Sequence, residues 1–300
     1  MTLEAALHPT ASQWLAGSRP RTLPAAASPV LAATGLAYAG GGFSPVAALL
    51  ALVVALALQV GVNYANDYSD GVRGTDANRV GPLRLVGSGV ARPGAVKRAA
   101  FGAFGLAGLA GLGLVLLTGH WWLLAVGAVC VLAAWSYTGG RRPYGYRGLG
   151  EVAVFVFFGL VAVSGTVYVQ LGRVTTATVL TGAWVGALAC ALLVANNLRD
   201  LRGDTAAGKR TLATRLGDRG TRLFYVGLVA GAAVLIVVVA LLTSLWALLG
   251  LAGLALAVPA CRRVLAGAAG RELIAVLKNT GTTELLAAVG FTLGLVLGHL

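Results

Sequence analysis

The sequence has 300 residues, of which 58% are hydrophobic and only 11% are charged, and its formal net charge is +13. A soluble globular domain carries about 25% charged and about 45–50% apolar residues, so this composition excludes an ordinary soluble protein. Apolar stretches of about 20 residues, the length that crosses a bilayer core of about 30 Å, recur along the chain. We therefore expect a multi-pass protein of the cell membrane.

The net positive charge could also indicate a nucleic-acid-binding protein, because basic patches bind phosphate backbones. Here the lysines and arginines gather in alternate connections between the apolar stretches, and only Arg173 falls in a short connection. A cytoplasmic excess of Lys and Arg is typical of membrane proteins. The distribution therefore favours membrane insertion and argues against a nucleic-acid partner.

The hydrophobic pattern predicts an all-α bundle of nine transmembrane helices. They are expected at residues 24–40, 45–66, 98–117, 121–138, 150–170, 176–198, 222–242, 244–261 and 280–298. The connections expected in the cytoplasm are the N-terminal segment 1–22 and the long loops 67–97, 139–149, 199–221 and 262–279. Nine crossings then place the N-terminus in the cytoplasm and the C-terminus outside.

The predicted second and sixth helices each end in an Asn/Asp cluster that is followed by a basic loop. Because the two clusters lie four helices apart, we expect two four-helix units followed by a final helix. The whole chain, 1–300, is predicted to form one transmembrane domain. Its loops 67–97 and 199–221 are expected to be cytoplasmic loops of the active site.

The first Asn/Asp cluster reads NYANDYSDGVRGTD and covers residues 63–76. If the second helix continues through it, Asn63, Asp67 and Asp70 share one helical face. Asp76 would lie beyond two glycines, where it is free to fold back toward the helix.

The second cluster reads NNLRDLRGD and covers residues 196–204, with Asn196, Asp200 and Asp204 spaced four apart on one face. Such residues can simply cap helices or form ion pairs. Carboxylates near hydrocarbon are costly, however, and usually mark a functional site. Clustered carboxylates also need a cation, and Mg²⁺ binds carboxylates together with phosphate oxygens. Two paired clusters with arginines nearby therefore favour a metal-bridged diphosphate site.

These motifs resemble those of the UbiA superfamily of intramembrane prenyltransferases. In the common first motif, NDxxDxxxD, the last aspartate would stand at Gly74, whereas here it is Asp76. This longer spacing is similar to the menaquinone branch of the family. Further segments that carry the resemblance are Trp14-Leu15, RPRTLP at 19–24, RVGPLRLVGSG at 79–89, and the run 196–217.

The resemblance implies Mg²⁺-dependent transfer of a polyprenyl group from polyprenyl diphosphate to 1,4-dihydroxy-2-naphthoate, with loss of CO₂ and diphosphate. Related acceptors are alternatives within the enzyme class: 4-hydroxybenzoate, homogentisate, haem or a phosphoribosyl diphosphate. A secondary transporter is the alternative from another class. It would carry its charged residues near the membrane midplane, whereas these motifs lie at one face.

On this reading the metal-binding residues are Asn66, Asp67, Asp70, Asp76, Asp200 and Asp204. Those expected to be catalytic are Asp67, Asp70, Asp200 and Asp204. The substrate-binding candidates, which would hold phosphate oxygens or contact the ring, are Asn66, Arg73, Asn197, Lys209, Arg141 and Tyr137. Arginine suits this role because its guanidinium binds phosphate in a bidentate manner. The prenyl tail is expected in an apolar groove that is continuous with membrane lipid.

Overall fold

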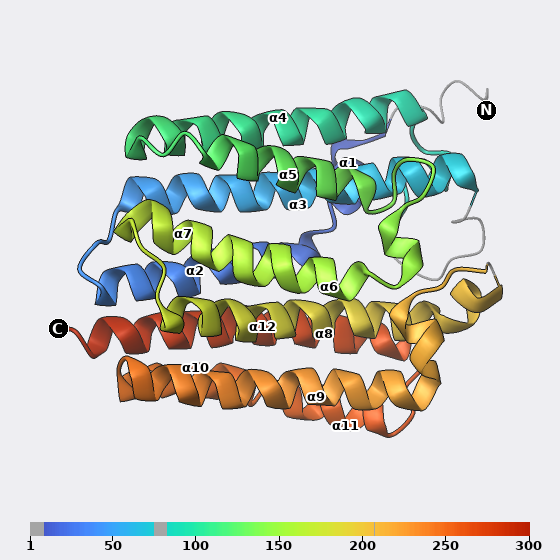
Figure 1. Cartoon of the computed structure of the whole chain (residues 1–300). Coiled ribbons are helices and arrows are strands. Elements are labelled where there is room, and N and C mark those ends of the chain that lie inside the picture. The colour runs from blue at the N-terminus through green and yellow to red at the C-terminus, as the bar shows by residue number, and fades with distance from the viewer. Residues whose placement is uncertain (1–8, 75–82, 207) are drawn as a thin grey trace.

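A computed structural model of the chain describes residues 9–74, 83–206 and 208–300. Within these ranges the ordered elements are all helices, with no β-strand, and the long helices run side by side as a bundle (Figure 1). The all-α membrane bundle expected from the hydrophobic pattern is therefore confirmed.

The first half of the chain contains α1 (Ala11–Gly17), α2 (Leu23–Ala39), α3 (Pro45–Arg73), α4 (Pro93–Thr118) and α5 (Leu123–Ser136). The second half contains α6 (Gly150–Val154), α7 (Ala162–Leu171), α8 (Thr176–Ala206), α9 (Leu212–Leu242), α10 (Leu249–Leu254), α11 (Ala257–Leu265) and α12 (Glu272–Leu297). A π-helical segment, η4 (Phe155–Val161), joins α6 and α7 into one continuous span. A short 3-10 turn, η3 (Tyr144–Arg147), stands between α5 and α6.

Six helical spans in the described residues are long and apolar enough to cross a membrane. The bent pair Leu245–Leu254 and Ala257–Leu265, with 46° between its parts, would make a seventh. Two further predicted crossings are shorter helices, because α2 has 17 residues and α5 has 14. The count of nine crossings, like the membrane orientation, stays a prediction.

Both motif-bearing helices extend farther than the sequence pattern indicated. The helix α3 begins at Pro45, where the Ser44 hydroxyl accepts a hydrogen bond from the backbone N–H of Ala47. It runs on to Arg73 instead of ending at residue 66, and Gly74, with φ +71°, terminates it. The helix α8 runs to Ala206 instead of ending at 198. Polar residues can continue a helix once it leaves the hydrocarbon, so hydrophobicity alone marks the end too early.

The two ends of the bundle differ in the length of their connections (Figure 1). The turns between α2 and α3, α4 and α5, α7 and α8, and α9 and α10 all lie at the end that also holds the C-terminus. The long connections lie at the opposite end, where α3 and α8 both finish. We call this opposite end the motif end, because it holds the C-terminal parts of α3 and α8.

The helix α8 is the most buried of the long spans. Its Trp184 and Leu188 are fully buried, and the indole of Trp184 packs edge-on against Phe291 of α12, with ring centroids 5.5 Å apart. Small residues on α8 allow a close approach on another side: a Cβ at Gly186 would lie 2.9 Å from the carbonyl oxygen of Phe155. Close helix contacts through small residues are typical of membrane bundles. They hold α8 rigidly beside the segment from α6 to α7.

Candidate active site

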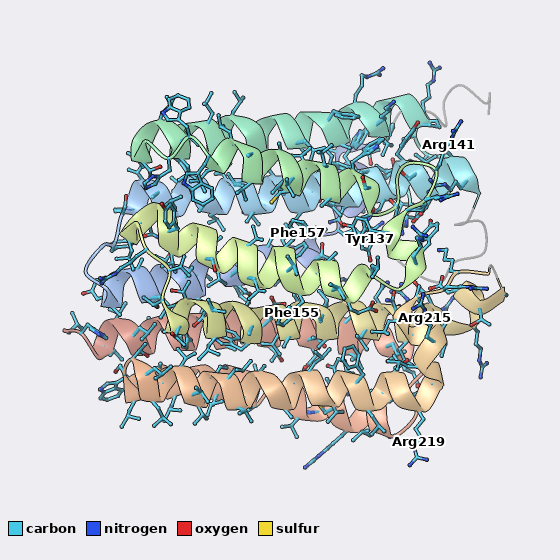
Figure 2. The ribbon with its side chains drawn as sticks, viewed as in Figure 1. Tyr137, Arg141, Phe155, Phe157, Arg215 and Arg219 are labelled. Atoms are coloured by element: carbon cyan, nitrogen blue, oxygen red, sulfur yellow. The ribbon has the colours of Figure 1, made fainter. Side chains whose placement is uncertain are left out.

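A cavity of about 1320 Å³ extends between α2, α3, α4, α5, the α6–α7 span and α8. At the motif end its walls are polar and carry residues of both Asn/Asp motifs. Farther along, the walls become apolar, with side chains such as Leu58, Val131 and Phe157. Figure 2 shows Phe157 farther from the motif end than Tyr137, another residue of the wall. The cavity therefore combines a polar head with a long apolar body.

Two residues of the first motif, Asn66 and Asp70, line the polar head. The side-chain oxygen of Asn66 accepts a hydrogen bond of 2.6 Å from the Thr138 hydroxyl. One carboxylate oxygen of Asp70 accepts a hydrogen bond from the Tyr146 hydroxyl, and the other lies 3.6 Å from Nη2 of Arg84. Both motif side chains are thus held by residues from other parts of the chain.

Asp67, from the same motif, has a different environment. Its side chain is 1% exposed and is not part of the cavity wall. The carboxylate accepts hydrogen bonds from the backbone N–H groups of Leu85, at 2.7 Å, and Val86, at 3.1 Å. Asp67 therefore fastens the segment that precedes α4 to α3. Its metal-binding and catalytic roles stay predictions.

The second motif reaches the same polar head from α8, through Asn196, Asn197, Asp200 and Asp204. Arg199 forms a bidentate pair with Asp200, with its Nε 2.8 Å from one carboxylate oxygen and its Nη2 2.9 Å from the other. Asp204 pairs with the Lys209 ammonium at 3.4 Å. The planar, two-point contact between Arg199 and Asp200 is the strongest ion-pair geometry that arginine offers. The structure thus brings residues of the two motifs, 130 positions apart in the sequence, to one polar head.

Tyr146 of the turn η3 connects the two motifs. Its hydroxyl donates to Asp70 of the first, while its ring lies 4.7 Å from the Lys209 ammonium that pairs with Asp204 of the second. The guanidinium of Arg73 lies 5.8 Å from the same ring. A cation over a ring face is attracted by the ring quadrupole, so Tyr146 gathers positive charge at the polar head. Tyr146 was not predicted, because nothing in its local sequence indicates that it folds back between the motifs.

Two further tyrosines form part of the wall beside Tyr146. Tyr137, a predicted substrate-binding residue, packs edge-on against Tyr144, with ring centroids 5.5 Å apart. The Tyr144 hydroxyl donates to the backbone oxygen of Ala133 at 2.8 Å. Burial raises the pKa of Tyr144 to about 12, so its phenol is neutral at physiological pH.

The remaining predicted residues are placed as follows. Asn197 lines the polar head and donates its amide to Glu151 at 2.9 Å, and Lys209 lines it as well. Arg73 is exposed and donates to the backbone oxygens of Thr138 and Gly140. Arg141 is exposed, lies at the outer edge of the motif end (Figure 2) and does not line the cavity. Asp76 lies outside the described residues.

The segment before α2 contributes Arg19 and Arg21 to the lining of the cavity. Asn63 of the first motif holds this segment, donating to the backbone oxygen of Ser18 at 2.8 Å and to the Thr22 hydroxyl at 3.0 Å. Arg19 adopts φ +54°, the only positive φ of a non-glycine residue in the described parts of the chain. Uncommon backbone conformations of this kind cluster at functional sites.

The donor groups at the polar head suit a cation that is bound together with a phosphate. In the residues that the structure describes, no three His, Cys, Asp or Glu side chains are grouped closely enough to hold a metal by themselves. Magnesium does not require such a cage, because it commonly binds one or two carboxylates, waters and substrate phosphates. Asn66, Asp70, Asp200 and Asp204 carry side-chain oxygen atoms of the kind that Mg²⁺ binds, and all four line the same cavity.

The fold and the site together define a multi-pass helical membrane protein with a polar site at one end of a long apolar cavity. The chain belongs to the UbiA prenyltransferase family, whose model matches residues 26–272. The family expected from the two motifs is therefore confirmed. Membership also removes the grounds for the transporter alternative.

Curated relatives extend over almost the whole chain. The 1,4-dihydroxy-2-naphthoate octaprenyltransferase of Mycobacterium tuberculosis is 53% identical over 96% of this chain and 98% of its own length. The enzyme of the same name from Escherichia coli K12 is 39% identical over 95% of this chain and 96% of its own length.

Solved structures confirm the fold. A UbiA homologue from Aeropyrum pernix K1 superposes with a TM-score of 0.66 at 16% identity, covering 92% of this chain and 98% of the homologue. A UbiA homologue from Archaeoglobus fulgidus, solved with DMAPP and Mg²⁺ bound, gives 0.63 at 14% identity, with 95% and 99% covered. At these identities the likeness concerns the fold.

Proposed function

We propose that this protein transfers a polyprenyl group from polyprenyl diphosphate to 1,4-dihydroxy-2-naphthoate in a Mg²⁺-dependent reaction. The observation that carries the proposal is the 53% identity, over nearly the full length of both chains, to a 1,4-dihydroxy-2-naphthoate octaprenyltransferase. The cavity supports it, because a polar head joined to a long apolar body matches a diphosphate joined to a prenyl tail. The Mg²⁺ bound to the Archaeoglobus fulgidus homologue supports the metal requirement.

In the proposed mechanism, the diphosphate would bind at the polar head, where Asn66, Asp70, Asp200 and Asp204 would hold Mg²⁺ through their side-chain oxygens. The bound ion would neutralise charge that develops on the leaving diphosphate. Three cations that now pair with carboxylates, Arg84, Arg199 and Lys209, are within reach of this head. They would bind phosphate oxygens and stabilise the leaving group further.

The proposed reaction needs no oxidant or reductant, because every bond that breaks is matched by a bond that forms or by an electron pair that stays on the leaving group or the ring. The allylic C–O bond breaks and leaves its electron pair on the diphosphate, while the prenyl carbon forms a C–C bond to the ring carbon that carries the carboxylate. The bond between that ring carbon and the carboxylate then breaks, so CO₂ departs and its electron pair returns to the ring. The rings of Tyr137, Tyr144 and Tyr146 lie along this wall and would stabilise the positive charge on the allyl group.

The polar head is proposed to face the cytoplasm. Supporting this orientation, the basic connections lie at the motif end, and Figure 2 shows Arg141, Arg215 and Arg219 there. An excess of Lys and Arg is the usual mark of the cytoplasmic side.

The test is an assay of purified protein in nanodiscs with Mg²⁺, a labelled polyprenyl diphosphate and 1,4-dihydroxy-2-naphthoate. We expect a prenylated, decarboxylated product that disappears with EDTA and falls by at least about 100-fold in Asp70→Ala and Asp200→Ala, the range typical when a group that stabilises developing charge is lost. Asp218→Asn is the matched control, since Asp218 is 59% exposed and pairs with Arg222 away from the cavity. If product forms with 4-hydroxybenzoate and not with 1,4-dihydroxy-2-naphthoate, the proposed acceptor is wrong. If no aromatic acceptor gives product, the proposed prenyl transfer is refuted.

A further inference from the structure

Glu151 is a buried acid at the start of α6 that the proposed mechanism does not use. Its side chain lies within a membrane span and is only 5% exposed. Its Oε1 accepts a hydrogen bond of 2.9 Å from Nδ2 of Asn197, a second-motif residue that lines the polar head. Acids inside membrane spans are costly and usually have a function. The contact links this acid directly to the proposed active site.

One face of α8 fixes where Glu151 lies. The thiol of Cys190 donates to the backbone oxygen of Glu151 at 3.0 Å. Cys190 and Asn197 are seven positions apart, about two helical turns, so they lie on the same face of α8. Gly186, one turn earlier on that face, lets the backbone of Phe155 come into direct contact. The backbone and the side chain of Glu151 are therefore both held against α8.

The contact also decides which end of the Asn197 amide faces the cavity. The Glu151 carboxylate oxygen accepts the hydrogen bond from Nδ2 of Asn197, so the nitrogen of the amide is turned toward Glu151. The amide oxygen, Oδ1, is then the end available to the polar head, whose wall includes Asn197. An oxygen suits a magnesium ion or a water bound to it, whereas an NH₂ group in that place would repel the cation.

We propose that Glu151 is a positioning residue that turns the carbonyl oxygen of Asn197 toward the cation at the polar head. This inference rests on the proposed function, because it requires a cation–diphosphate site there. Glu151 does not line the cavity, so its effect passes through Asn197. Removal of groups that orient a metal-site residue typically weakens metal affinity by about 10–100-fold.

The experiment measures binding instead of turnover. Protein in nanodiscs is mixed with an unreactive prenyl S-thiolodiphosphate, and the Mg²⁺ concentration for half-maximal binding of this analogue is determined. We expect Glu151→Gln to raise that concentration by about tenfold, because a glutamine offers both a donor and an acceptor and no longer fixes the amide. Glu151→Leu, which offers no acceptor, should raise it at least as much.

Glu284→Gln is the matched control. Glu284 is a second acid of a membrane span, fully buried in α12, and neither of its carboxylate oxygens has a hydrogen-bond partner in the described chain. In the described residues it forms no hydrogen bond or ion pair with either motif, so its substitution should leave the Mg²⁺ requirement unchanged. An equal shift in both Gln variants would mean that any buried acid has this effect, which would overturn the proposal.

A double-mutant cycle separates positioning from general destabilisation. In an Asn197→Ala background, Glu151→Gln should cause no further shift in the Mg²⁺ requirement, because its target is gone. Additive shifts, or wild-type Mg²⁺ dependence of Glu151→Gln, would refute the role of Glu151. If the wild-type protein itself binds the analogue without Mg²⁺, the proposed metal-dependent function fails instead, so the two failures are distinguishable.

Discussion

Hydrogen bonds and ion pairs between side chains orient the carboxylates at the polar head. Asp70 has both carboxylate oxygens engaged, one by the Tyr146 hydroxyl and the other by the Arg84 guanidinium. Asp200 is held by the residue next to it, Arg199. Charged groups that are oriented before the substrate binds need not reorganise during the reaction, which is how enzymes stabilise developing charge. The carboxylates are therefore positioned in advance of ligand binding.

Tyr146→Phe tests the residue that connects the two motifs. The variant keeps the ring between Arg73 and Lys209 but removes the hydrogen bond to Asp70. A hydrogen bond to a charged group is worth about 1.5–3 kcal/mol, so kcat should fall by about tenfold or more with little change in melting temperature. Steady-state kinetics with Tyr38→Phe, in α2, as the control will check this; equal kcat in both variants would contradict it.

Asp67→Ala distinguishes the positional role seen in the structure from the metal-binding role predicted by the motif. Loss of its carboxylate leaves two backbone N–H groups, of Leu85 and Val86, without their acceptor. Each unpaired buried donor costs about 1–3 kcal/mol, so the melting temperature in detergent should fall and the segment before α4 should be cleaved faster by protease. An unchanged melting temperature with lost Mg²⁺ dependence would instead support direct metal binding.

At the level of elements, the contact between the α6–α7 span and α8 places the second motif. The π-helical segment η4 lies directly against α8, where a Cβ at Gly159 would be 2.4 Å from the carbonyl oxygen of Gly182. π-helical turns are rare and occur often at functional sites. Here the segment joins Glu151 to the cavity wall at Phe157 and Phe158. The polar head therefore depends on close packing deep in the bundle.

Gly159→Ala should push these two helices apart, because its new methyl group would meet backbone atoms that cannot move aside. Overpacking typically costs about 1–3 kcal/mol, so we expect a lower melting temperature and a weaker response to Mg²⁺. Gly105→Ala is the matched control, since nothing lies within 4 Å of a Cβ at that position in α4. Thermal unfolding of both variants in nanodiscs decides the point: equal melting temperatures would show that the contact is not tight.

For the molecule as a whole, charge and helix ends indicate how the bundle inserts. Both motif helices finish at the end with the long, basic connections, and the C-terminus lies at the other end (Figure 1). This arrangement would give the proposed polyprenyl diphosphate one orientation, with its head at the motif end and its tail in the membrane interior. The proposed orientation and the proposed substrate therefore support each other.

A fusion at Leu300 tests this orientation. With the motif end in the cytoplasm, a C-terminal alkaline phosphatase should be active outside the inner membrane of a bacterial host, while a C-terminal green fluorescent protein should not fluoresce. Of the Lys and Arg residues, only Arg173 lies in the short turns, which is why we expect this result. The opposite pair of readings would reverse the topology and place the polar head outside.

The sequence by itself determined the membrane class, the helical architecture and the family, because composition, apolar stretches of spanning length and two spaced motifs are local properties. It also indicated that Asp70 and Asp200 belong to one site. Helix ends were less predictable, as the extensions of α3 to Arg73 and α8 to Ala206 show, since a helix can leave the hydrocarbon without ending.

Only the tertiary structure decided which motif residues face the cavity and which partners hold them. Asp67 and Asp70 look alike in the sequence, yet one binds backbone N–H groups and the other lines the polar head. Tyr146 and Glu151 carry no motif, and they join the site because η3 and α6 pack against α3 and α8. Their roles depend on contacts between distant segments, and no local spacing encodes such contacts.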